Sequence, residues 1–480
     1  MHDLIQGMGK EIVRRQSPKE PEKRSRLWLN EDIISILEEN KGTEKIEAIN
    51  LDMLGDKEVK WDGMAFKKMS NLMMLIIRNA RFSTSPKYLP SSLKVLDWKG
   101  YPYSHLPCHF NPKQLVILRM PESCFMLTES LKMFQSLCVM DFRGCQRVKR
   151  IPDLSEVPNL NELWLEGCKD LISVHPSVGF LGKLKRLSVK NCRKLRTFLS
   201  IWLSSLEYFD LSECESLQKF PEILGTMENL REINLNYSGI EELPLSFKNL
   251  AGLQKLELTR CLRLQEVRGI SPNIKELELV NVNWYSHLSS ESRKILLNQA
   301  LHEIDGLKIT IEEDRTPEWL DHCTEGDSVS FWIRKQFPNM AVCFAASIAD
   351  PYHDQLELHI NVWINGVDVG FPYHEAIHAS ITSQHIFLFD LQHLIPEEKL
   401  NGVILDREWN RVEVYCYLDF LNYYADDWDS RRGISSPKWS GIYVYRKKSS
   451  EEDIRFTSPD EDPIFHFPRS EGSSSNPLFG

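Results

Sequence analysis

Between Leu72 and Ile274 one short hydrophobic pattern recurs ten times, with apolar residues at the first, fourth and sixth positions of each copy. The first positions fall at residues 72, 93, 115, 137, 160, 184, 206, 230, 253 and 274. Alternation over the last three positions predicts a short β-strand whose apolar side chains are buried. Such strands bury their apolar side only if each copy stacks on the next, so the pattern predicts a stack of parallel strands.

The spacing of the copies indicates the class of stack. Successive copies lie 21 to 24 residues apart, and a period of about 20–29 residues is typical of leucine-rich repeats. We predict an α/β leucine-rich-repeat solenoid over residues 46–300, with about ten repeats, parallel strands on its concave face and a first strand starting at Ile46. A helix over 289–306 would cap the stack, and residues 301–316 would form a linker. Such a fold presents a long surface and no inherent catalytic pocket, so binding is the first functional hypothesis.

The same alternation predicts which side chains leave the concave sheet. The residue between the fourth and sixth positions defines a largely acidic central column: Asp97, Arg119, Asp141, Trp164, Ser188, Asp210, Asn234, Glu257 and Glu278. Trp164, with Arg and Tyr nearby, has the composition of an interface hot spot. We predict partner contacts at Arg119, Asp141, Trp164, Arg186, Lys190, Tyr208 and Glu232. The alternative is a solvated face with interleaved charge.

Both ends of the chain depart from the repeat. Residues 1–45 predict two short helices with Asn30 as an N-cap and Gly42 as a stop, and each helix has an apolar side: Leu4, Met8, Ile12, and Ile33, Ile34, Leu37. After Pro317, six short strands rich in aromatic and β-branched residues are predicted over 328–333, 340–347, 356–364, 385–391, 411–420 and 440–446. They predict an all-β antiparallel sandwich over 317–447, followed by a disordered tail over 448–480.

Two local motifs lie in this β-rich region. Asn365-Gly366 is a type I′ hairpin signal. His374, Glu375 and His378 match H-E-x-x-H, which on a helix would place two imidazoles on zinc with the glutamate as general base. The flanking residues are typical of strands joined by a loop, so we expect a polar His-rich loop and no metal.

Composition excludes some functions. The formal net charge of −10 argues against a dedicated nucleic-acid binder, and no apolar run approaches the roughly 18 residues of a membrane span. The N-terminus lacks a secretory signal. Five of the eleven cysteines fall three residues after the last apolar position of a copy: Cys145, Cys168, Cys192, Cys214 and Cys261. Equivalent positions predict stacked inward thiols that meet backbone carbonyls rather than disulfides, as suits a reducing compartment.

The first fifty residues also carry a specific resemblance. The run MHDLIQGMGKEIVRRQSPKEPEKRSRLWLNEDIISILEENKGTEKIEAINLD resembles the junction of the nucleotide-binding and repeat domains in plant TIR-NB-ARC-LRR disease-resistance proteins. PEWLDHCTEGDSVSFWI and later strands resemble the C-terminal jelly-roll/Ig-like domain (C-JID) of these receptors. The resemblance implies that 1–45 is the winged-helix end of NB-ARC and that 317–447 is a C-JID. It also implies that His2 and Asp3, within the match to the MHD motif, correspond to residues that contact ADP in the family.

The sequence departs from that family in two respects. It contains no G-x-x-x-x-G-K-[ST] loop to cradle phosphates, and no TIR domain, which carries the NAD⁺-cleaving activity of the family. We therefore expect no cofactor and no catalysis in this chain, with ADP or ATP bound only by the full-length family. We expect the sequence to be a truncated product, a separate exon product or a fragment.

Two functional hypotheses follow from the resemblance. The leading one is the recognition portion of an intracellular immune receptor, which binds a pathogen effector or a guarded host protein through the concave face and C-JID in defence signalling. A full-length receptor could also be its partner. The alternative is a fragment of a TIR-type NAD⁺ hydrolase receptor. We expect the cytoplasm or nucleus as its location, with neither nucleic acid nor a membrane as partner.

Overall fold

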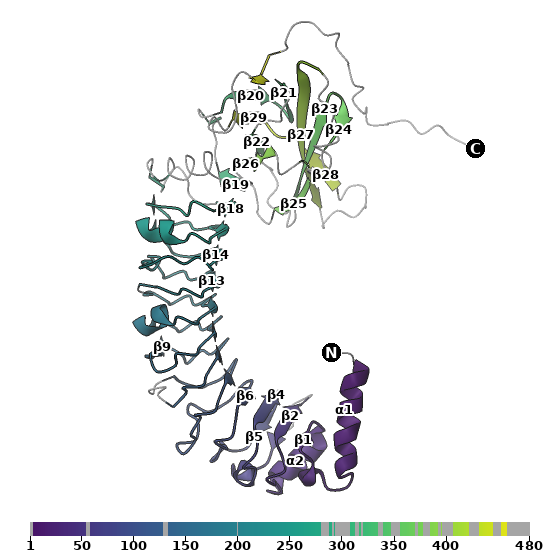
Figure 1. Cartoon of the computed structure of the whole chain (residues 1–480), viewed down its shortest axis with the longest axis vertical. Coiled ribbons are helices and arrows are strands. Elements are labelled where there is room, and N and C mark those ends of the chain that lie inside the picture. Colours follow the sequence, from purple (N-terminus) through teal and green to yellow (C-terminus); the bar gives the residue numbers. More distant parts are fainter. Residues whose placement is uncertain are drawn as a thin grey trace, which may run out of the picture. The chain divides into compact units, whose positions relative to one another are not determined.

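Each of the ten predicted repeats contributes one strand to a continuous parallel sheet (Figure 1). The strands are β4 (Met74–Arg78), β6 (Val95–Trp98), β7 (Ile117–Arg119), β8 (Val139–Asp141), β10 (Glu162–Trp164), β12 (Arg186–Ser188), β13 (Tyr208–Asp210), β14 (Glu232–Asn234), β16 (Lys255–Glu257) and β18 (Glu276–Glu278). Leu163 of β10 lies opposite Met140 on one side and Leu187 on the other, and all three are buried. The predicted solenoid is confirmed.

These strands come from a computed structural model of the chain. It describes residues 3–53, 58–127, 133–198 and 200–279, and shorter segments between 288 and 457. The chain forms two compact units, residues 1–314 and 315–480.

The parallel sheet begins earlier than the sequence pattern predicts. β2 (Ala48–Asp52) pairs with β4, but its other edge pairs with the two-residue strand β1 (Arg26–Leu27). The expectation that the strand near Ile46 starts the sheet is therefore wrong. β1 is too short to show an alternating pattern, and only its Leu27 is buried.

Helix α2 (Asn30–Glu38) covers the first turns of the stack. It buries Ile33, Ile34, Ile36 and Leu37 and contacts β2 and β3 (Glu58–Val59). Asn30 is the first helical residue rather than the N-cap, because its side-chain amide bonds the backbone of Asp52. The helix ends before Gly42, with Glu39 as its C-cap.

The other N-terminal helix, α1 (Asp3–Gln16), shares little of this core. Ile5, Met8 and Ile12 on its surface are each about 60% exposed. Its apolar stripe is therefore not buried within the described part of the chain.

The inner side of the stack holds a ladder of thiols. The five repeat cysteines donate to carbonyls 25 to 27 residues earlier: Cys145 to Met120 (3.0 Å), Cys168 to Phe142 (3.1 Å), Cys192 to Leu165 (3.2 Å), Cys214 to Val189 (3.2 Å) and Cys261 to Leu235 (3.1 Å). All five are fully buried free thiols. This confirms the predicted stacking.

Shorter elements form the side opposite the concave sheet (Figure 1). They include the paired strands β9 (Arg150–Ile151) and β11 (Ser173–Val174), and β15 (Glu242–Leu243) and β17 (Glu266–Val267). β3 pairs with β5 (Arg81–Phe82), and the 3₁₀ helices η1 (Pro21–Lys23), η2 (Ala65–Lys68), η3 (Pro176–Phe180) and η4 (Leu245–Asn249) complete the turns.

The far end of unit 1 differs from the prediction. The stretch expected to be a linker, 301–316, contains β19 (Lys308–Glu312), which extends the parallel sheet from β18. The capping helix expected over 289–306 falls almost entirely outside the described residues, as does the tail beyond residue 457.

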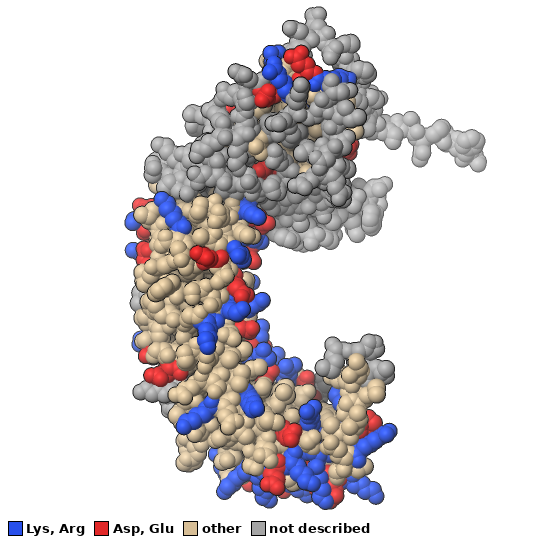
Figure 2. All heavy atoms as spheres, viewed as in Figure 1, with Lys and Arg blue, Asp and Glu red and all other residues tan. Residues whose placement is uncertain are grey.

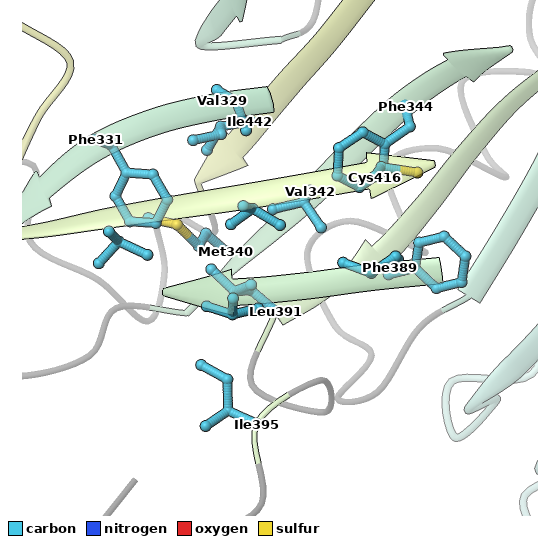
Figure 3. Close-up of a cluster of buried hydrophobic side chains, with 14 of the residues drawn as sticks. Val329, Phe331, Met340, Val342, Phe344, Phe389, Leu391, Ile395, Cys416 and Ile442 are labelled. Carbon is cyan, nitrogen blue, oxygen red and sulfur yellow. The ribbon is translucent and has the colours of Figure 1, made fainter. Parts of the chain in front are cut away.

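Unit 2 consists of antiparallel sheets around one core. The first sheet contains β20 (His322–Glu325), β29 (Trp439–Val444), β22 (Met340–Ala346) and β26 (His385–Asp390). The second contains β24 (Val367–Asp368), β23 (Leu356–Ile364), β27 (Asn410–Leu421), β21 (Ser328–Ile333) and β30 (Ile454–Arg455), with β25 (Tyr373–Ile377) and β28 (Arg432–Ser435) at its edges. Residues of both, such as Phe331 and Phe344, share the core (Figure 3). The predicted antiparallel sandwich is confirmed, but it extends beyond residue 447. The expectation of a disordered tail from residue 448 is wrong at β30, because this strand pairs with β21.

The two local motifs of this unit have different outcomes. Asn365 and Gly366 both have positive φ, +49° and +83°, and join β23 to β24 as a hairpin. His374 and Glu375 lie in β25, which pairs with β23, so the expectation of a loop there is wrong. An extended strand cannot present the one-turn spacing that a zinc helix requires. His378 lies outside the described residues.

Among the described residues, no helix combines the length and the apolar character needed to cross a bilayer.

Candidate protein-binding face

Three columns of side chains project from the concave sheet of unit 1, because alternate residues of each strand face the same way. The leading column contains the first residue of each strand from β4 to β18. The central column contains the residue two positions after it, and the trailing column contains the residue four positions after it. Parallel register places neighbours side by side, so that Glu162, Arg186 and Tyr208 are adjacent in the leading column.

The central column is much less exposed than the sequence pattern indicates. Four of its members are at most 5% exposed: Asp97, Asp141, Ser188 and Asp210. Because the face is concave, central side chains converge and their neighbours cover them. Arg143 makes hydrogen bonds of 3.0 and 2.7 Å to the two carboxylate oxygens of Asp141, for example. The alternative of a solvated face is therefore wrong for these four residues.

Trp164 lies at the centre of a fixed aromatic and cationic cluster. Its indole Nε1 donates to Glu162 Oε2 at 2.9 Å. The Arg143 guanidinium lies 5.9 Å from the indole centroid, within reach of a cation–π contact. The Tyr208 ring lies 6.5 Å away on the other side. Since Asp141 holds Arg143 in place, the indole is half-buried between neighbours with fixed positions.

Tyr208 is fixed in the same way. Its hydroxyl donates to Asp210 Oδ2 at 2.9 Å. Burial, followed by the negative charge of Asp210, raises the pKa of Tyr208, so the hydroxyl remains a donor across the physiological range. The nearby Ser188 hydroxyl is buried and has no hydrogen-bond partner among the described residues.

An apolar lane, which the sequence analysis did not identify, adjoins this cluster. The leading column of the first four strands contains only apolar residues, in register and each exposed at least in part: Met74, Val95, Ile117 and Val139. Met74 is 40% exposed. The sequence could have shown this lane. The four residues occupy outward positions of the alternation, where the later copies carry Glu, Arg, Tyr or Lys.

The predicted contact residues occupy one surface. They lie on or just after six adjacent strands, β7 to β14, which span about 24 Å at roughly 4.8 Å per strand. Arg186 and Lys190 are exposed, whereas Arg119, Trp164, Tyr208 and Glu232 are half-buried. Asp141 is buried and orients Arg143, so it cannot be a direct contact.

Charged residues of both signs lie along this face. On its early strands Arg78 pairs with Asp97 at 3.3 Å, Lys99 with Glu122 at 3.1 Å and Arg143 with Asp141 at 2.7 Å. Its late strands carry Glu232, Glu257 and Glu276. Among the described residues no carboxylate pairs with Arg119 or Arg186, while Lys255 lies within 4.0 Å of both Glu257 and Glu276. Figure 2 shows charged groups of both signs interspersed along the inner edge of unit 1.

The MHD residues cannot be assessed as a nucleotide site. His2 lies outside the described residues, and Asp3 begins α1 with a side chain whose surroundings are not described. Their correspondence to ADP contacts therefore stays a prediction.

The chain is similar in sequence to plant disease-resistance proteins. The chain is 33% identical to TMV resistance protein N of Nicotiana glutinosa, over 64% of this chain and 26% of that protein. It is 38% identical to disease resistance protein RPP2A of Arabidopsis thaliana, over 56% and 21%, and 27% identical to RPS6 of the same plant, over 72% and 43%. These homologues are TIR-NBS-LRR disease-resistance proteins. The chain spans about a quarter of the length of the first two resistance proteins.

No protein-family model matches the chain. Among solved structures, a leucine-rich-repeat protein of Leptospira interrogans has a TM-score of 0.33 at 17% identity, covering 59% of this chain and 90% of its own. An internalin of Listeria monocytogenes has a TM-score of 0.34 at 15% identity, covering 54% and 79%.

Proposed function

We propose that this chain is the recognition portion of a plant intracellular immune receptor and that its concave face binds a protein, either a pathogen effector or a guarded host protein. The homology to disease-resistance proteins supports the receptor role. The Trp164 cluster is the observation that carries the binding site, because an aromatic residue held by Arg143, Glu162 and Tyr208 contacts a partner with little loss of side-chain entropy.

The surface also suggests what the partner presents. The apolar lane would take apolar side chains. Arg119 and Arg186, which have no carboxylate partner among the described residues, would favour carboxylates beside them. The acidic late strands would favour basic groups at the other end. The partner would thus dock in one direction, because reversing it would place like charges together.

The remaining features of the proposal concern the second unit and the compartment. Unit 2 would act as a C-JID that adds a second contact to the same partner. The buried, hydrogen-bonded thiol ladder suits a reducing compartment, the cytoplasm or nucleus. Any NAD⁺-cleaving output would belong to a TIR domain outside this sequence, and binding to a protein would bias the receptor only if its two states bind with different affinity.

Substitution of Trp164 and Arg186 tests the concave site. Trp164→Ala combined with Arg186→Ala is expected to weaken partner binding by about 2 kcal/mol or more, which is about 30-fold, because both groups would be lost from the centre of the contact. The tagged full chain would be cross-linked and purified from leaves with and without pathogen challenge. Proteins enriched by challenge would be quantified, and the affinity of each would be titrated with purified components.

Trp202→Ala is the matched control. Trp202 is 55% exposed, and its backbone N–H bonds Gly179 in η3, away from the concave sheet. It should leave the affinity within about twofold of wild type. The proposal would be contradicted if the partner bound the double variant as tightly as wild type but bound Trp202→Ala more weakly. The partner would then contact the side of the stack that carries Trp202 and not the concave face.

A further inference from the structure

A separate cavity of about 1000 Å³ opens on the side of unit 1 that carries β9 and β11. Its described lining comes from these two strands, the loop around Met126, the turns that follow β8 and β10, the start of η3 and Thr197 of the next repeat, and includes no residue of the concave sheet. Its volume lies at the upper end of the range of about 300–1,000 Å³ found for small-molecule sites. The cavity is thus distinct from the proposed protein-binding face.

The floor of this cavity is apolar. Leu127, Ile151 and Val174 line it and are only 7%, 2% and 4% exposed. These side chains belong to the buried layer of three successive repeats, so the packing of the stack fixes their positions. They offer a preformed apolar surface to a flat or extended group.

The rim of the cavity is basic. Arg147, Lys149 and Arg150 line it and are exposed. Within the described part of the chain no carboxylate lies within ion-pair distance of these three side chains. Among the described lining residues the one carboxylate is Asp170, which pairs with Lys194 at 2.7 Å and also interacts at longer range with the charge of Lys149.

Elsewhere on the same side of the stack, an arginine is paired with carboxylates of the neighbouring strands. At the later paired strands β15 and β17, the position of Arg150 is taken by Glu242 and Glu266. Arg268 lies 3.0 Å from the first carboxylate and 2.9 Å from the second. A hollow lined by charges of one sign raises the local concentration of ions of the opposite sign, here anions.

We propose that this cavity binds an amphipathic organic anion, with an apolar body on the floor and a phosphate, sulfonate or carboxylate group at the basic rim. Guanidinium groups favour such oxyanions through paired hydrogen bonds. Neither half of the site is sufficient alone: a simple inorganic anion would not use the floor, and an uncharged apolar molecule would not use the rim.

Fluorescence titration of the full chain with 8-anilinonaphthalene-1-sulfonate tests this site. Lys149→Glu combined with Arg150→Glu is expected to weaken probe binding about tenfold or more, because two attractive charges become repulsive. The control is Lys67→Glu with Lys68→Glu, an exposed pair in η2 with the same charge change. It should keep the affinity within about twofold of wild type. Equal losses in the two variants, or none in either, would overturn the proposal.

Two further probes separate the contributions. N-phenyl-1-naphthylamine, which has the same aromatic body without the sulfonate, should bind about tenfold more weakly, and inorganic phosphate should displace the sulfonate only at far higher concentration. If the uncharged probe binds as tightly as the sulfonate, the rim plays no part. If inorganic phosphate competes at equal concentration, the floor plays none. Either result would overturn the assignment, and neither depends on the protein partner of the concave face.

Discussion

Replacing Gly239 with alanine is expected to lower the free energy of unfolding of unit 1 by about 3 kcal/mol. A β-carbon at this position would lie 2.1 Å from the carbonyl oxygen of Glu215 and 2.8 Å from its carbon. Both atoms are backbone of the preceding repeat, so no side chain can move aside to relieve the clash. The glycine N–H also donates to the Cys214 carbonyl at 3.0 Å, which holds the two repeats at this distance.

The sequence of this repeat explains why the approach is so close. In the preceding copy, Cys214 is followed three residues later by buried Leu217. Here Ser238 stands in place of the cysteine, and the next buried apolar side chain, that of Ile240, follows only two residues later. The turn is one residue shorter, and the backbone must pass directly over its neighbour.

Urea unfolding followed by circular dichroism would measure the effect. Gly182→Ala is the control, because a β-carbon at Gly182 would meet no atom within 4 Å. The control should change stability by no more than about 0.5 kcal/mol. A Gly239→Ala protein as stable as the Gly182→Ala protein would show that the stack relaxes around this contact.

Much of the fold could be predicted because burial follows a period. Leu163, Leu187 and their equivalents recur at a spacing that only a stack of strands can bury, and the cysteines shared that period. The strands of unit 2 could be found because β-branched and aromatic residues are concentrated in short runs between turns such as Asn365-Gly366. β1 could not be found, because two residues carry no period.

The candidate site was only partly predictable, for a different physical reason. Alternation predicts the face of the sheet from which a side chain projects, but it does not predict how exposed that side chain is. Asp141 and Asp210 leave toward the concave side, yet curvature brings Arg143 and Tyr208 over them. The same geometry converts Trp164 from an isolated aromatic residue into the centre of a cluster. The apolar lane was not predicted, because the prediction considered only the charged and aromatic residues of the outward positions. Val95 and Ile117 occupy the same outward positions but carry no charge.

Raising the pH from 8 to 10.5 is expected to destabilise unit 1 through its ladder of thiols. Burial raises the pKa of Cys145 and of Cys261 from the ordinary 9.0 to about 11, and that of Cys168 and of Cys214 to about 12. The folded state therefore keeps its thiol protons at a pH where the unfolded state releases them. Stability is fully present below pH 9 and is lost as the pH rises from 9 toward the folded values.

The size of this effect follows from the pKa difference. For one thiol with a folded pKa of about 11, the loss by pH 10.5 is about 2 kcal/mol. Several such thiols together approach the whole stability of an ordinary domain, about 5–15 kcal/mol. Urea unfolding at pH 8, 9.5 and 10.5 would measure the loss.

A single substitution separates the thiol contribution from the ionisation of lysines and tyrosines. Cys145→Ala should cost about 1–2 kcal/mol at pH 8, because it removes a buried side chain and its bond to the Met120 carbonyl. At pH 10.5 the variant should be nearly as stable as wild type, because it no longer has a proton to lose on unfolding. Cys108→Ala removes an exposed thiol. The difference in free energy of unfolding between this variant and wild type should be the same at pH 8, 9.5 and 10.5. A cost of Cys145→Ala that is the same at pH 8 and pH 10.5 would mean that the buried ladder does not titrate with unfolding, and the alkaline loss would then have to come from other groups.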